Sequence, residues 1–199
     1  MNAPVEIPIF PLNTVLFPGG RLPLRIFEMR YVDMTKACIR DDAVFGVCQI
    51  LEGREAGEAA VPVPIGCTAR IAEWEVPTPG LFNLDTRGEQ VFRILDQRVE
   101  RDGLIRAQVV LEPAPVAQAL PTSQELLGRM LSEIIDKVGA KHFPQPVQLG
   151  DATWVAYRLA EILPISVDQK LAWLQYNDPV RILAEIEATV FGEEDSGTE

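Results

Sequence analysis

The stretch from Ile9 to Arg30 (IFPLNTVLFPGGRLPLRIFEMR) constrains the fold of this chain more than any other segment. It is rich in proline and large apolar residues, and it carries no charge between Phe10 and Gly20. Such a segment does not make a solvated linker, because its apolar side chains would remain in water. Nor can it form one long helix, since each of its three prolines removes a backbone donor and clashes with the preceding turn. We therefore expect short extended pieces joined by turns, one of them at residues 18–20.

A helix is expected directly after the last of these extended pieces, which ends at Ile26. Apolar residues recur there at steps of four, three and four, which is one face of a helix: Phe27, Tyr31, Met34 and Cys38. Glu28 lies near the expected start, where a negative charge is favoured by the exposed amide groups. We expect Glu28 to complement the helix dipole with Arg25 as its partner, and a direct binding role is the alternative.

The pattern of residues 1–115 predicts short strands separated by turns. Residues 43–51 form a nearly continuous apolar run, which is typical of a buried strand, and residues 66–76 alternate between apolar and polar side chains. Further strands are expected at 81–85, 90–100 and 104–111, with an Asp-Gly turn before the last. Short strands at this spacing indicate a small barrel or sandwich.

Residues 116–192 are expected to be helical, after a linker at 112–121 that contains three prolines. The capping patterns Thr122-x-x-Glu125 and Ser166-x-x-Gln169 predict the starts of two helices. Asp151 and the pair Asp178-Pro179 predict the starts of two more. Residues 193–199 make an acidic tail that we expect to be disordered. We expect the β part and the helical part to pack together as one body.

The run from Ile7 to Tyr31 resembles the opening signature of the Lon protease N-terminal domain, which also occurs in stand-alone bacterial proteins and in cereblon. The shared order is Pro-Leu, an apolar run, Phe-Pro-Gly, a second Pro-Leu and then a helix. A second stretch, AEILPISVDQKLAWLQ at residues 160–175, resembles the Leu-Pro-containing helix pair of that family. The resemblance covers nearly the whole chain. It implies an α+β fold, in which an N-terminal PUA-like β pseudo-barrel with one inserted helix (1–115) precedes a C-terminal helical bundle (116–192).

Charge and hydropathy weigh against two classes of partner. The chain holds 18 basic and 29 acidic residues, a net charge of −11, whereas a nucleic-acid binder usually needs a basic face. No run approaches the ~20 apolar residues of a membrane span, and the N-terminus lacks a signal-peptide pattern. We therefore expect a cytoplasmic protein with neither nucleic acid nor membrane as its partner.

Residues that could carry catalysis or bind a metal are sparse. No Gly-Lys dipeptide is present for a phosphate-binding loop, and no Gly-x-Ser-x-Gly elbow occurs. The single histidine, His142, and the three cysteines show no ligand spacing. We expect Cys38, Cys48 and Cys67 to be small buried hydrophobes, although a Cys-His pair that meets only in space stays open. No catalytic residue, metal or cofactor is predicted.

What remains is a binding surface, and the resemblance implies that it serves substrate recognition. The best supplier of exposed apolar atoms is the opening stretch, in which we select Phe17, Pro18, Leu24 and Phe27 as candidate peptide-binding residues. The expected partners are unfolded or exposed apolar polypeptide segments. Two alternatives stay open: a docking subunit of a protease or chaperone assembly, and a small hydrolase.

Overall fold

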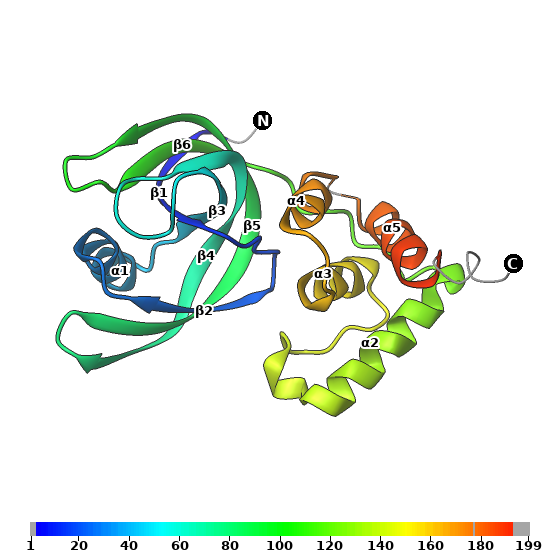
Figure 1. The fold of residues 1–199 in the computed structure, drawn as a ribbon. Helices are drawn as coiled ribbons and strands as arrows, with labels where there is room; N and C mark the ends of the chain where they lie inside the picture. The colour runs from blue at the N-terminus through cyan, green and yellow to red at the C-terminus, as the bar shows by residue number, and fades with distance from the viewer. Residues whose placement is uncertain (1–2, 177, 193–199) are drawn as a thin grey trace, which may run out of the picture. The chain divides into compact units, whose positions relative to one another are not determined.

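The computed structural model describes residues 3–176 and 178–192 (Figure 1). The chain divides into two compact units, one that ends at Ala114 and one that begins at Pro115. This boundary falls within the proline-rich segment 112–121. The acidic tail predicted at 193–199 lies outside the described residues. No helix in the described ranges is long and apolar enough to cross a membrane.

The first unit is a six-stranded sheet with one helix, which confirms the mixed α+β class. Its elements in chain order are β1 (Val5–Leu12), β2 (Arg21–Ile26), α1 (Met29–Asp41), β3 (Phe45–Glu52), β4 (Val61–Thr78), β5 (Leu81–Val99) and β6 (Ile105–Leu111). The strand order is β2-β5-β4-β3-β1-β6, and β5 also pairs with β6. Five strands therefore close into a circuit that begins and ends at β5, and β2 is attached outside it (Figure 1). Among the strands that the structure describes, β1 and β3 pair in parallel and the other pairings are antiparallel.

Strand β5 differs from the prediction, because the expected strands 81–85 and 90–100 are one strand of 19 residues. Its first half pairs with β2 over residues 82–87, and its second half pairs with β6 over residues 92–99. Gly88 lies between the two halves. A Cβ atom there would come within 2.2 Å of the carbonyl oxygen of Phe17, so no side chain fits. The alternation of apolar and polar residues did not predict one continuous strand, because the strand changes its pairing partner midway.

The predicted turn at residues 18–20 is confirmed, and it is fixed to β5. The amide of Gly20 donates to the Phe17 carbonyl at 2.9 Å, and Gly19 has φ 77°, which a type II turn requires after Pro18. Gly19 donates to the carbonyl of Gly88 at 2.7 Å, and Gly88 donates to that of Gly20 at 2.9 Å. The opening stretch is thus held to the sheet through its main chain.

Helix α1 confirms the prediction of a helix, but it begins at Met29, so Phe27 precedes it. Tyr31, Met34 and Cys38 are buried on one face, as expected, whereas the Phe27 side chain is 62% exposed. Assigning Phe27 to the apolar stripe was therefore wrong. The expected partner of Glu28 was also wrong, because its carboxylate pairs with Arg30 at 2.9 Å.

The second unit contains four α-helices in its described residues. They are α2 (Glu125–Val138), α3 (Ala152–Ile162), α4 (Val167–Tyr176) and α5 (Pro179–Phe191), with single 3-10 turns at Thr122–Gln124 and Ala140–His142. Helix α3 is buried along almost its whole length, from Ala152 to Ala160 apart from Thr153. Its buried Arg158 forms a two-point ion pair with Glu161, with both contacts at 2.8 Å.

Three of the four predicted helix starts are confirmed by hydrogen bonds that main-chain amides donate to side-chain oxygens. Asp151 accepts from the amide of Trp154 at 2.7 Å, Ser166 from Gln169 at 3.2 Å, and Asp178 from Arg181 at 3.1 Å. The capping box predicted at Thr122 is wrong. The chain already turns there as a 3-10 helix, and α2 begins at residue 125 without a side-chain cap.

Candidate functional site

The structure separates the four predicted surface residues into two pairs. Phe17 is fully buried, so its ring offers no surface to a partner, and we correct its inclusion. Pro18 is half-buried in the turn fixed to β5. Leu24 and Phe27, by contrast, line the same pocket. We call this hollow the Leu24–Phe27 pocket.

The Leu24–Phe27 pocket has a volume of about 220 Å³ and draws its walls from β1, β2, the start of α1 and the loop after β3. Its lining residues are Phe10, Leu12, Pro23, Leu24, Arg25, Ile26, Phe27, Glu28, Tyr31, Glu55 and Ala56. Phe10, Leu12, Ile26 and Tyr31 are buried and belong to the core of the first unit. The pocket is therefore an apolar opening onto that core, with the exposed ring of Phe27 at its rim.

The aromatic residues of the core wall are tightly arranged. The ring centroids of Phe10 and Tyr31 lie 4.2 Å apart with a tilt of 41°. The guanidinium of Arg30 lies 4.6 Å from the centroid of the Tyr31 ring. Burial raises the pKa of Tyr31, so its phenol stays neutral at physiological pH. The rings of Phe10 and Tyr31 thus give the pocket an uncharged aromatic wall.

The charged residues at the rim have partners of their own. Glu28 pairs with Arg30, whose guanidinium also donates to the carbonyl of Gly103 at 3.1 Å. Glu55 accepts from the amide of Asn13 at 2.6 Å, which fixes the loop after β3 beside the end of β1. The side chain of Arg25 is exposed. The rim thus mixes both signs of charge and does not favour a partner of one sign.

A second hollow, of about 270 Å³, lies on the β4–β5 hairpin. Its lining residues are Glu73, Trp74, Glu75, Asn83, Leu84 and Asp85. Trp74 is 52% exposed, so it is the one large aromatic residue of this hairpin that faces solvent, while Phe82 beside it is buried. Three carboxylates line this hollow, which makes it a poor site for apolar side chains.

The expected behaviour of the cysteines is confirmed. Cys38, Cys48 and Cys67 are all buried, as expected of small hydrophobic residues. Burial raises the pKa of Cys38 to about 11 and also raises that of Cys48, so both thiols are protonated near neutral pH. His142 is exposed and belongs to the second unit. Within the described part of the chain, no group of three or more His, Cys, Asp or Glu residues could hold a metal ion.

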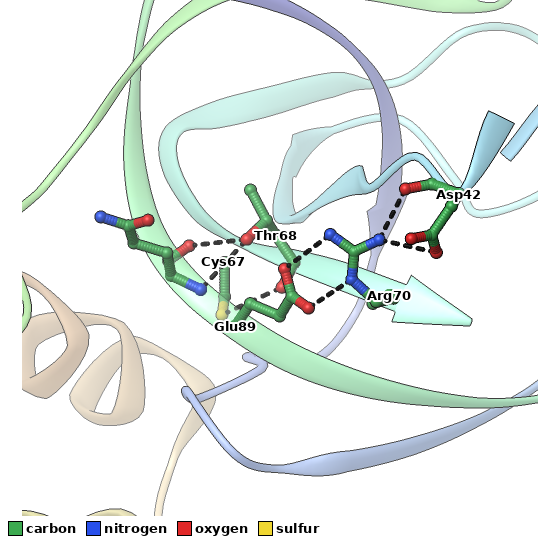
Figure 2. A network of polar contacts seen from close by, with 6 residues as sticks. Asp42, Cys67, Thr68, Arg70 and Glu89 are labelled. Carbon is green, nitrogen blue, oxygen red and sulfur yellow. Dashed lines mark hydrogen bonds and ion pairs between the residues drawn. The ribbon is translucent and has the colours of Figure 1, made fainter. Parts of the chain in front are cut away.

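Figure 2 shows a polar network on the first unit that the sequence did not reveal. Arg70 contacts Glu89 on β5 and Asp42 at the end of α1. The hydroxyl of Thr68 donates to the carbonyl of Gln90 at 3.2 Å and accepts from its amide at 3.0 Å. These bonds fall where β4 and β5 shift register, between Cys67 and Ala69. The network stabilises the sheet and lies outside the lining of both hollows.

Several pocket residues were not predicted. Phe10 and Tyr31 were expected only as parts of a strand and of a helix face. Their positions at one end of the core could not be read from local periodicity, because the pairing of β1 with β3 and the packing of α1 bring them together. Glu55 lies in a polar loop with no pattern that marks it as part of a site.

Comparison with known proteins gives one consistent result. A family described as the ATP-dependent protease La (LON) substrate-binding domain matches residues 6–187. The crystal structure of a Lon N-terminal domain protein from Xanthomonas campestris has a TM-score of 0.78 and 35% sequence identity, covering 92% of this chain and 98% of that one.

Two full-length relatives show the same similarity over part of their length. A Lon protease of Anaeromyxobacter dehalogenans is 25% identical over 176 residues, which is 84% of this chain and 20% of the protease. The protein cereblon of Gallus gallus is 29% identical over 124 residues, which is 60% of this chain and 27% of cereblon. The chain therefore spans about a fifth to a quarter of the length of these relatives.

Proposed function

This chain belongs to the family of ATP-dependent protease La (LON) substrate-binding domains, and we propose that it is a non-catalytic module that binds exposed apolar segments of other polypeptides. The observation that carries this proposal is the Leu24–Phe27 pocket, in which an exposed aromatic ring stands beside an opening onto the apolar core. We also propose that the closed circuit of strands is the PUA-like pseudo-barrel of the family and that the four helices are its bundle.

The size of the pocket favours a side chain over a small molecule. Sites for drug-sized ligands usually enclose roughly 300–1,000 Å³. At about 220 Å³, this pocket is suited to one large apolar side chain, or two small ones, of a longer polypeptide. The exposed Met29, which follows Glu28 at the start of α1, adds apolar surface nearby.

The character of the rim favours recognition that tolerates different sequences. Its charges are of both signs, and two of its carboxylates already have partners within the chain. A partner would gain mainly by burying apolar surface, which contributes ~1.5–3 kcal/mol for a large side chain before ordering costs. Binding through one pocket should therefore be weak.

A matched pair of variants tests this proposal. Phe27 is 62% exposed and lines the pocket, whereas Leu95 on β5 is 60% exposed and does not. With a fluorescein-labelled, permanently unfolded apolar polypeptide as the probe, Phe27→Ser should weaken binding at least threefold. Leu95→Ser should leave it unchanged. Equal affinities for the two variants would refute a role for this pocket.

Docking on a protease or chaperone assembly is the second candidate. It is supported by the similarity to Lon proteases, in which a segment like this chain makes up about a fifth of the protein. Capture from lysate of the native host would separate the two functions. A client-binding module should retain many different unfolded proteins, whereas a docking subunit should retain one assembly in fixed proportion.

A further inference from the structure

Strand β2 has one edge without a partner strand. Within the described part of the chain it pairs only with β5, and it lies outside the closed circuit of the other strands (Figure 1). The main-chain donors and acceptors on its other edge are therefore not used by the sheet. Such an edge can pair with the main chain of another polypeptide.

The hydrogen bonds of β2 show which residues face this free edge. The carbonyl of Gly20 accepts from the amide of Gly88 at 2.9 Å, and the carbonyl of Leu22 accepts from the Thr86 hydroxyl at 2.7 Å. The main-chain groups of the even-numbered residues therefore point toward β5. The register from Arg21 to Ile26 contains no shift. Because the direction of the main-chain groups alternates along an antiparallel strand, those of Pro23 and Arg25 point away from β5. The missing N–H of Pro23 falls on that side, where a proline is tolerated.

The Leu24–Phe27 pocket lies along the same edge. Four consecutive β2 residues, Pro23 to Ile26, line it. Side chains of consecutive strand residues point to opposite faces of a sheet. A pocket that touches all four must therefore run beside the strand, next to the carbonyl of Pro23 and the N–H and carbonyl of Arg25.

We propose that an extended segment of a partner polypeptide adds to the free edge of β2 and places one apolar side chain in the Leu24–Phe27 pocket. This inference rests on the proposed function and specifies how the polypeptide is held. Main-chain bonds to Arg25 and to the Pro23 carbonyl would supply affinity that does not depend on sequence, and the pocket would select an apolar residue. A helical partner could not make these bonds, because its own main-chain groups are already paired.

Pro23 also limits the strength of this edge. It removes one donor, so the added ladder would contain only about three hydrogen bonds, each contributing modestly. Proline and exposed charged residues on edge strands also discourage uncontrolled pairing between copies. Arg21, Pro23 and Arg25 are the exposed side chains of β2. The edge is therefore suited to weak and reversible pairing.

Two substitutions at one position test the proposal. Arg25→Ala and Arg25→Pro both remove the guanidinium, but only the proline removes the N–H on the free edge. The β2–β5 ladder should survive in both, because Arg25 does not donate to β5. The probe is a fluorescein-labelled peptide of about nine residues in which leucine alternates with serine. Arg25→Pro should bind it at least threefold more weakly than Arg25→Ala.

A second measurement leaves the protein unchanged. Single N-methylations along the same peptide should weaken binding to the wild-type chain at every second residue only, because alternate amides of an extended strand face β2. This scan also decides the matter if Arg25→Pro does not fold.

The outcomes separate this inference from the proposed function. Equal binding by both Arg25 variants, or an N-methylation profile without a period of two, would overturn edge pairing. If Phe27→Ser still weakens binding in that case, the pocket acts without the strand edge. If the wild-type chain does not bind the peptide at all, both proposals are wrong.

Discussion

The guanidinium of Arg70 donates to the main-chain carbonyl of Asp42 at 2.6 Å and to the carboxylate of the same residue at 2.9 Å (Figure 2). Asp42 is the C-cap residue of α1 and has a left-handed conformation with φ 47°. On its other side Arg70 contacts the carboxylate of Glu89 through Nε and Nη2. One side chain on β4 thus connects the end of α1 with β5.

Substituting Arg70 should therefore destabilise the chain more than breaking an ordinary surface ion pair. Arg70→Met loses a bond to a helix-terminal carbonyl together with two ion pairs, and should lower the free energy of unfolding by about 1 kcal/mol. Arg40→Met is the control, because the Arg40–Asp41 pair is largely exposed and connects no other element. Urea denaturation followed by circular dichroism measures both. Equal midpoints for the two variants would show that the Arg70 contacts contribute nothing beyond a surface pair.

The close approach of Gly88 to Phe17 gives a second prediction on stability. Because a Cβ at residue 88 would lie 2.2 Å from a main-chain oxygen, Gly88→Ala must displace the opening stretch. The expected cost is ~1–3 kcal/mol, as for overpacked sites. Gly150→Ala is the matched control, since nothing lies within 4 Å of a Cβ there. A thermal midpoint for Gly88→Ala that equals the control would contradict the close packing of the turn on β5.

The thiols should be unreactive in the folded chain. At pH 8, Ellman's reagent should modify none of the three cysteines until denaturant is added, because all are buried and the pKa of Cys38 is raised to about 11. The same shift predicts a pH dependence. Because the pKa of Cys38 in the folded chain lies above its ordinary value near 9, its contribution to the stability of the fold is fully present below pH 9. This contribution is lost as the pH rises toward 11. Rapid labelling of one native thiol would instead indicate a reactive cysteine and revive the hydrolase alternative.

Limited proteolysis tests the division of the chain. The start of the linker is fixed to the first unit, because Gln90 donates to the carbonyl of Glu112 at 2.7 Å. Its end is fixed to the second unit, where the amide of Leu120 donates to the carbonyl of Gly150 at 2.8 Å. We predict that a protease trims the chain beyond Gly192 before it cuts the short span between these anchors. Early cutting at Glu112 that releases two stable halves would contradict this prediction.

The sequence was most informative where local chemistry decides the structure. The turn before Arg21 and the caps at Asp151 and Asp178 follow from residue types at fixed positions, and each was predicted. The capping box at Thr122 was wrong because the same residues also allow a 3-10 turn, and only the surrounding packing selects between them. Patterns of this kind identify an element more reliably than they fix its first residue.

The candidate site was only half predictable. Leu24 and Phe27 were selected because the opening stretch holds more apolar residues than a short strand and turn require. The same reasoning selected Phe17, which the fold buries, since excess hydrophobicity does not show which side chains face the core. The edge of β2 could not be found at all, because it depends on which strands pair far apart in the sequence.

The most direct test of polypeptide binding is a titration of the wild-type chain with a labelled unfolded apolar polypeptide at low ionic strength and at ~1 M salt, where the screening length is only ~3 Å. Burial of apolar surface in the Leu24–Phe27 pocket predicts weak binding whose affinity changes little between the two conditions. Binding that is absent at low salt, or that disappears at high salt, would contradict an apolar site. The net charge of −11 would then be the better basis for recognition of a partner.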